Sequence, residues 1–101
     1  HRNSSVYPNQ YSGVESLVYN AVSDANVLAE NINAQLEAVG WQNLGVNERP
    51  NLVVLNRTEM PAVLLEIGFI NTENDNLMYD AKFQETADAI AEGILNTLGI
   101  Y

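Results

Sequence analysis

The stretch PAVLLEIGFIN, residues 61–71, constrains the fold more than any other part of the sequence. An apolar run over residues 63–70 surrounds a single carboxylate, Glu66. Such a nearly continuous run is typical of a strand buried on both faces, which requires a sheet covered by helices. A buried, unpaired carboxylate costs several kcal/mol, or its pKa rises until it holds a proton. The sequence therefore predicts a covered sheet with Glu66 in a special environment.

Two amphipathic helices are predicted on either side of this strand in the chain. The first runs from about Asp24 to Val39, with Ser23 as N-cap and Gly40 as its C-terminal stop. The second ends at Gly99. Apolar residues recur every three or four positions in both, as on the buried face of a helix. These residues are Leu28, Ile32, Leu36 and Val39 in the first helix, and Phe83, Ala87, Ile90, Ile94 and Leu98 in the second.

The remaining segments complete an α/β order of strand, helix, strand, strand, helix. Residues 14–19 and 52–55 predict short strands, whereas residues 1–12 and 41–51 predict loops. Residues 72–75 have the form of a capping box for a short helical turn. We therefore expect part of a mixed sheet flanked by helices. The core of such a sheet is thin for a chain of 101 residues. It is expected to be incomplete without an upstream segment.

Charge excludes several kinds of partner. Thirteen acidic residues oppose four basic ones, which gives a net charge of −9. Nucleic acids and anionic membrane surfaces both need a basic footprint, so neither is an expected partner. The sequence has no cysteine, which rules out disulfides and thiolate chemistry. No apolar run approaches the roughly 20 residues of a membrane span.

A few side chains are candidates for chemistry. Glu66 has the apolar surroundings that suit a general base, but a structural role, such as an ion pair with Arg57, is equally open. His1 is the sole histidine, and Asn3 beside it either orients a ligand or shapes a loop. Arg49 and Arg57 either hold a substrate carboxylate or pair with a neighbouring Glu.

Three stretches resemble a known family. HRNSS (1–5), GVESLVY (13–19) and ERPNLVVLNRTEMPAVLLEIGFINTENDN (48–76) are similar, in order and spacing, to the zinc-dependent N-acetylmuramoyl-L-alanine amidases of the amidase-3 type. The resemblance implies hydrolysis of the amide between N-acetylmuramic acid and L-alanine in peptidoglycan, outside the cytoplasmic membrane. It implies that His1 of H-x-N is a zinc (Zn2+) ligand and that Glu66 of E-I-G-F is the catalytic carboxylate. Asn3, Arg49 and Arg57 are the candidate substrate-binding residues.

The same resemblance implies that part of the site lies elsewhere. The family binds zinc through a further His and a Glu, both upstream of H-x-N, and this chain has neither. We therefore expect residues 1–101 to be the C-terminal portion of one catalytic domain, inactive alone. A truncated peptidoglycan-binding module, or an acidic interaction domain with a structural Glu66, is the alternative.

Overall fold

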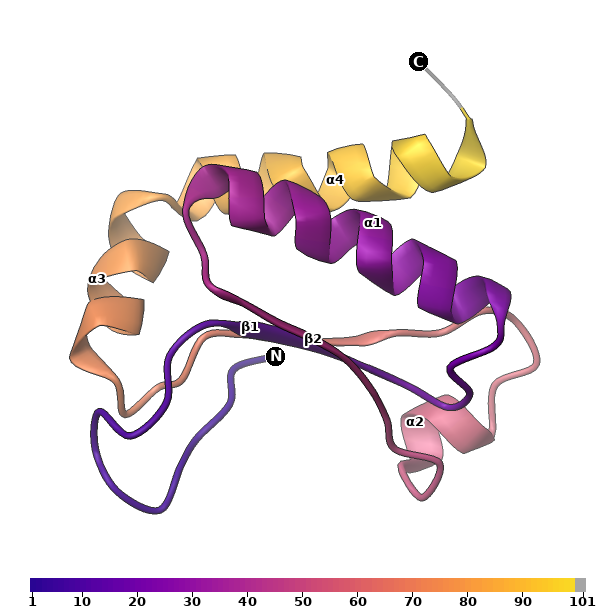
Figure 1. Cartoon of the computed structure of the whole chain (residues 1–101), viewed down its shortest axis with the longest axis horizontal. Coiled ribbons are helices and arrows are strands. Elements are labelled where there is room, and N and C mark those ends of the chain that lie inside the picture. Colours follow the sequence, from indigo (N-terminus) through magenta and orange to yellow (C-terminus); the bar gives the residue numbers. More distant parts are fainter. Residues whose placement is uncertain (100–101) are drawn as a thin grey trace.

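A three-stranded mixed sheet and four helices make up the described part of the chain, residues 1–99, in a computed structural model (Figure 1). The strand order is β2-β1-β3, with β1 parallel to β2 and antiparallel to β3. The predicted α/β class is therefore confirmed. The strands are β1 (Val14–Val18), β2 (Asn43–Glu48) and β3 (Leu64–Ile67), and the helices are α1 (Asp24–Val39), α2 (Val53–Asn56), α3 (Glu73–Ala81) and α4 (Phe83–Leu98).

The hydrophobic core lies between one face of the sheet and the pair α1 and α4, which run side by side (Figure 1). Its buried members come from both sheet and helices: Val14, Ile32, Leu36, Trp41, Ile67 and Ala89. Because neighbouring residues of a strand point to opposite faces, Glu15 and Glu66 belong to the other face. Figure 1 shows neither α1 nor α4 on that face. We call it the open face.

The two long helices are confirmed at their predicted bounds. Gly40 ends α1 and donates its N–H to Glu37 O, and Gly99 ends α4 in the left-handed conformation with φ of 69°. Ser23 holds the N-cap position, but its hydroxyl donates to Asn20 O instead of to the helix.

Residues 52–55, predicted as a buried strand, begin the short helix α2. The N–H groups of Leu55 and Asn56 both donate to Leu52 O. Val53 and Val54 are 67% and 57% exposed, and only Leu55 is buried. The prediction was wrong because β-branched side chains favour a strand only where a pleated, half-buried surface surrounds them.

The predicted loop at residues 41–51 contains β2, and the predicted strand at residues 63–70 is shorter than expected. Every residue of β2 is at least partly exposed, so it shows no apolar pattern. β3 ends at Ile67, where Gly68 takes φ of 74°, and Ile70 is 55% exposed. The helical turn predicted at Thr72 extends into the nine-residue α3. Thr72 donates its hydroxyl to Tyr11 O, and Asn9 Oδ1 accepts the Glu73 N–H at the start of the helix.

Candidate active site

The first three residues, predicted as loop, extend the sheet beyond β3. Ile67 donates its N–H to His1 O at 2.8 Å, and Asn3 donates its N–H to Gly68 O at 2.9 Å. Asn3 and Phe69 form a parallel bridge. This pairing holds His1 next to the central part of β3, although 65 residues separate His1 from Glu66.

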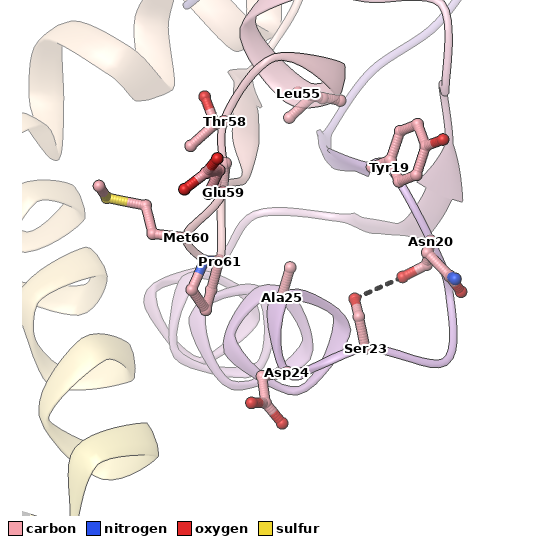
Figure 2. Close-up of a pocket in the computed structure, with 11 residues that line it drawn as sticks. Tyr19, Asn20, Ser23, Asp24, Ala25, Leu55, Thr58, Glu59, Met60 and Pro61 are labelled. Carbon is pink, nitrogen blue, oxygen red and sulfur yellow. Dashed lines mark hydrogen bonds between the residues drawn. The ribbon is translucent and has the colours of Figure 1, made fainter.

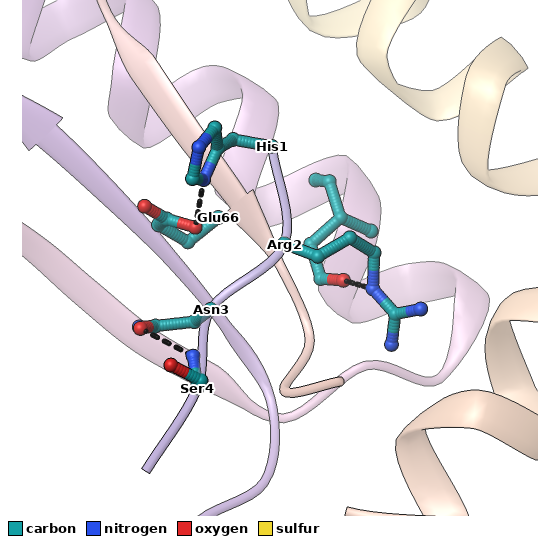
Figure 3. A network of polar contacts seen from close by, with 6 residues as sticks. His1, Arg2, Asn3, Ser4 and Glu66 are labelled. Carbon is teal, nitrogen blue, oxygen red and sulfur yellow. Dashed lines mark hydrogen bonds and ion pairs between the residues drawn. The ribbon is translucent and has the colours of Figure 1, made fainter. Parts of the chain in front are cut away.

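His1 and Glu66 meet on the open face. Figure 3 shows the imidazole leaning over the Glu66 carboxylate, with His1 Nδ1 3.0 Å from Glu66 Oε2. Glu66 is 7% exposed, whereas the His1 side chain is 65% exposed. An ionised Glu66 carboxylate can only accept a hydrogen bond, so in that state the proton of this contact is on Nδ1. The structure thus brings the two strongest candidates of the sequence together.

Burial raises the pKa of the Glu66 carboxyl. In residues 1–99 the ion-pair partner of Glu66 is His1, so the alternative partner Arg57 is wrong. A buried carboxylate beside an imidazole suits a proton acceptor, because it gains a proton more readily than an exposed glutamate.

Arg2 fixes this arrangement, and sequence reasoning missed it. Its Nε donates to Ile67 O at 2.6 Å, its Nη2 donates to Asn76 Oδ1 at 3.0 Å, and its guanidinium lies 4.2 Å from the centre of the Tyr79 ring. Figure 3 shows Arg2 pointing away from Glu66. An extended H-R-N segment alternates its side chains, so Arg2 must face the side opposite to His1 and Asn3.

Asn3 takes the loop-shaping role that the sequence left open. Its Oδ1 accepts the N–H of Ser4 at 2.8 Å, and its side chain extends to the same side as Glu66 (Figure 3). A substrate contact through its amide nitrogen stays a prediction.

Asp75 is a second residue that the sequence did not single out. It is buried, and its carboxylate accepts the Ser12 hydroxyl at 2.5 Å, the Gly13 N–H at 3.0 Å and the Phe69 N–H at 2.9 Å. One side chain of α3 therefore joins the start of β1 to the segment after β3. The sequence placed Asp75 in the predicted capping box of residues 72–75, which is wrong: Thr72 makes no side-chain cap, and its N–H donates to Phe69 O instead of to Asp75.

Glu15 lies directly across from Glu66 in the β1–β3 register and on the same open face. Asn47 of β2 donates its Nδ2 to Glu15 Oε2 at 2.7 Å. Like charges opposite each other in a sheet repel by a few tenths of a kcal/mol or more, and the Asn47 contact offsets part of this. The alternation in GVESLV places Glu15 opposite to Val14 and Ser16, which was the available signal.

The arginine candidates lie at the other end of the sheet. The Arg49 N–H donates to Val18 O, at the end of β1, and its guanidinium donates to Glu48 O. Arg57 is exposed directly after α2. Neither forms an ion pair with Glu48 or Glu59 within the described chain. These residues can contact only a substrate that extends along the sheet, away from Glu66.

A pocket of about 300 Å³ also lies at that end (Figure 2). It is formed between the start of α1 and the segment leading to β3, with Leu55, Met60 and Pro61 in its wall. Asp24 and Glu59 are its charged residues. None of the predicted site residues lines it.

A complete metal centre is not found within residues 1–99, because no group of three His, Cys, Asp or Glu side chains converges there. A catalytic zinc site needs three protein ligands. The chemistry of His1 fits one ligand, since its side chain is 65% exposed while Nδ1 contacts a carboxylate, as is usual for metal-bound histidines. The described residues of this chain alone do not supply the three ligands of a catalytic zinc site.

Comparison with known proteins decides the family. The model of the Amidase_3 family, described as N-acetylmuramoyl-L-alanine amidase, matches residues 1–96. The chain belongs to this family. Among solved structures, the Amidase_3 chain resembles the catalytic domain of the CD27L endolysin, with a TM-score of 0.85 and 30% identity over 95% of this chain. It also resembles AmiC2 of Nostoc punctiforme, an N-acetylmuramoyl-L-alanine amidase, with a TM-score of 0.86 and 28% identity over 98% of this chain.

Curated Amidase_3 relatives are similar over most of this chain but are much longer. An uncharacterised cell wall amidase of Bacillus anthracis is 36% identical over 83% of this chain and 18% of its own length. The probable cell wall amidase LytH of Staphylococcus aureus is 31% identical over 83% of this chain and 28% of its own length. The chain also spans only 51% of the CD27L structure and 55% of AmiC2.

Proposed function

We propose that this chain is the C-terminal portion of a catalytic domain that hydrolyses the amide between N-acetylmuramic acid and L-alanine in peptidoglycan. One observation carries the proposal: His1 of H-x-N and Glu66 of E-I-G-F lie 3.0 Å apart on the open face. Membership of the amidase family supports the reaction class. The cell wall amidases among the relatives support a site of action at the cell wall.

Glu66 acts as the general base in this proposal. Its burial raises its pKa toward the range in which a carboxylate takes a proton from water and returns it to the leaving amine. β3 is held on both sides, by β1 and by residues 1–3, so the carboxylate has a fixed position. A rigid support of this kind is what a catalytic base requires.

His1 is proposed as one zinc ligand, with a His and a Glu from an upstream segment as the others. Bound zinc would polarise the scissile carbonyl and lower the pKa of water. This chain contributes the exposed imidazole and the carboxylate that orients it. Arg2, the next residue after His1, donates a hydrogen bond to Ile67 O and so holds the backbone at His1 against β3.

Replacement of Glu66 tests the proposal. In the complete domain, with the upstream half joined ahead of His1, Glu66→Gln is expected to lower release of muramoyl-linked peptides by about a hundredfold or more, since general acid–base catalysis is worth at least that. Glu85→Gln, on the exposed surface of α4, is the matched control and should keep full activity. Hydrolysis is followed by the new L-alanine amino groups. Near-normal turnover of Glu66→Gln would refute the role of Glu66.

A further inference from the structure

A groove beside the His1–Glu66 pair has no assigned role. Its volume is about 440 Å³, which is within the range of small-molecule sites. The segment after residue 3 forms one wall, and the beginnings of β1 and β2 with Phe69 form the floor. Because Glu15 lines it and pairs with Glu66 across the strands, the groove adjoins the proposed base. We call it the Glu15 groove; its main lining residues are Asn3, Ser5, Gln10, Tyr11, Glu15 and Phe69.

The charges of the groove select against an anionic ligand. No lysine, arginine or histidine is among its lining residues, and Glu15 supplies a carboxylate. The peptide stem of peptidoglycan carries carboxylates, which would need a cationic partner to leave water. The candidate cations Arg49 and Arg57 lie at the opposite end of the sheet. A neutral ligand rich in hydroxyl and amide groups fits the groove better.

The side chains of the groove have the chemistry that recognises a sugar. Asn47 holds one oxygen of Glu15, which fixes the carboxylate as an acceptor for hydroxyl groups. Asn3 and Gln10 add amide groups. Tyr11 is 55% exposed and rests against the buried ring of Phe69, with centroids 5.9 Å apart. This support presents a rigid, amphipathic ring surface to a ligand.

We propose that the Glu15 groove binds the N-acetylated sugar on the acyl side of the scissile amide. The peptide stem of the bound substrate then extends away from the groove. The choice of substrate rests on the proposed function. Glu15 is then a specificity residue for the glycan and takes no part in proton transfer. The groove would place the sugar, and with it the lactyl carbonyl, next to Glu66.

Binding of a neutral glycan to the 101-residue chain tests this. The probe is N-acetylglucosaminyl-N-acetylmuramic acid with its lactyl carboxyl capped as a methylamide, titrated by NMR. We expect shifts at Tyr11 and Glu15, and a roughly tenfold loss of affinity in Glu15→Gln, since the variant replaces a charged hydrogen-bond acceptor with a neutral one. Tyr11→Ala should also weaken binding. Tyr19→Ala and Glu59→Gln, at the other end of the sheet, are matched controls that should bind normally.

The inference is overturned if the capped disaccharide does not bind, if a free L-alanyl-D-glutamyl peptide binds the groove instead, or if both groove variants bind normally. Circular dichroism checks that Glu15→Gln is folded, and Tyr11 is exposed enough for its variant to fold. Failure here is distinct from failure of the proposed function. Loss of hydrolysis in Glu66→Gln without disaccharide binding refutes only the groove, whereas binding by a domain that never cleaves refutes only the amidase activity.

Discussion

At the scale of single residues, Glu66 couples stability to pH. Burial raises its pKa in the folded chain above its ordinary value, so the folded state binds the proton more tightly than the unfolded state. The stability that this difference in pKa contributes is fully present below the pKa of Glu66 in the unfolded state. It is lost as the pH rises through the pKa of Glu66 in the folded state. We therefore expect the free energy of unfolding of the wild type, relative to Glu66→Gln, to fall as the pH rises above the ordinary pKa of a glutamate.

Urea unfolding of both proteins at several pH values measures this difference. Comparison with Glu66→Gln cancels the titration of the other carboxylates, which are the same in both proteins. A difference that stayed constant with pH, or that grew in favour of the wild type as pH rose, would contradict the assigned environment of Glu66.

Asp75 is expected to be a main structural link between the segment after β3 and the start of β1. Asp75→Ala would leave the Gly13 and Phe69 N–H groups without their acceptor, at a cost of about 1–3 kcal/mol for each buried group. Asp75→Asn keeps one acceptor oxygen and should cost less. Asp80→Ala, on the exposed side of α3, is the control and should lie within about 0.5 kcal/mol of the wild type. Chemical denaturation of the three variants checks this order, and equal losses at both positions would contradict it.

Residue types alone predicted some of these roles and not others. Glu66 stood out because a carboxylate in an apolar run needs a reason. Gly68 after it has φ of 74°, and a Cβ there would lie 2.9 Å from the Trp41 ring. The contacts of Arg2 with Ile67 and Asn76, and those of Asp75 with Ser12 and Gly13, could not be predicted, because these partners are distant in the sequence. The pairing of His1 with Glu66 came from the family resemblance.

At the scale of elements, the contact between α1 and α4 depends on Gly93. A Cβ at this position would lie 2.5 Å from Ile32 Cα and 2.8 Å from Ile32 N, both backbone atoms of α1. Gly93→Ala should therefore destabilise the chain by about 1–2 kcal/mol, because overpacking outweighs the gain of about 1 kcal/mol in helix propensity. Glu92→Ala, exposed on the same helix, should be neutral or slightly stabilising. A higher melting temperature for Gly93→Ala would show that the helices are not packed this closely.

The long helices were predicted well. Among the short elements, the strand predicted at residues 14–19 is confirmed as β1, whereas β2 and α2 were not predicted. α1 and α4 have apolar stripes over several turns, and their bounds match the prediction. β2 was missed because it is polar and because Gly45, with φ of 91°, lies where its register with β1 shifts. Its asparagines instead bind neighbours: Asn43 Oδ1 accepts hydrogen bonds from Asn33 Nδ2 and Gly45 N. β2 forms through backbone pairing with β1, which the periodicity of its side chains does not predict.

At the scale of the whole molecule, the two faces of the sheet differ. One face of its sheet is covered by α1 and α4, while the other carries His1, Glu15 and Glu66. It spans about half of the amidase structures that it resembles. No helix in the described chain is long and apolar enough to cross a membrane. The sequence predicted an incomplete sheet from its thin core, and the family comparison agrees with that expectation.

Zinc content tests the account most directly. Mass spectrometry of the 101-residue chain, dialysed against sub-stoichiometric zinc, should show almost no bound metal, because His1 is a single ligand. Joined to the upstream half, the same chain should bind about one zinc, Glu66→Gln should keep it, and His1→Ala should lose most of it. Tight binding of one zinc by the chain alone, or full zinc occupancy in His1→Ala, would contradict a zinc site formed by His1 together with the upstream segment.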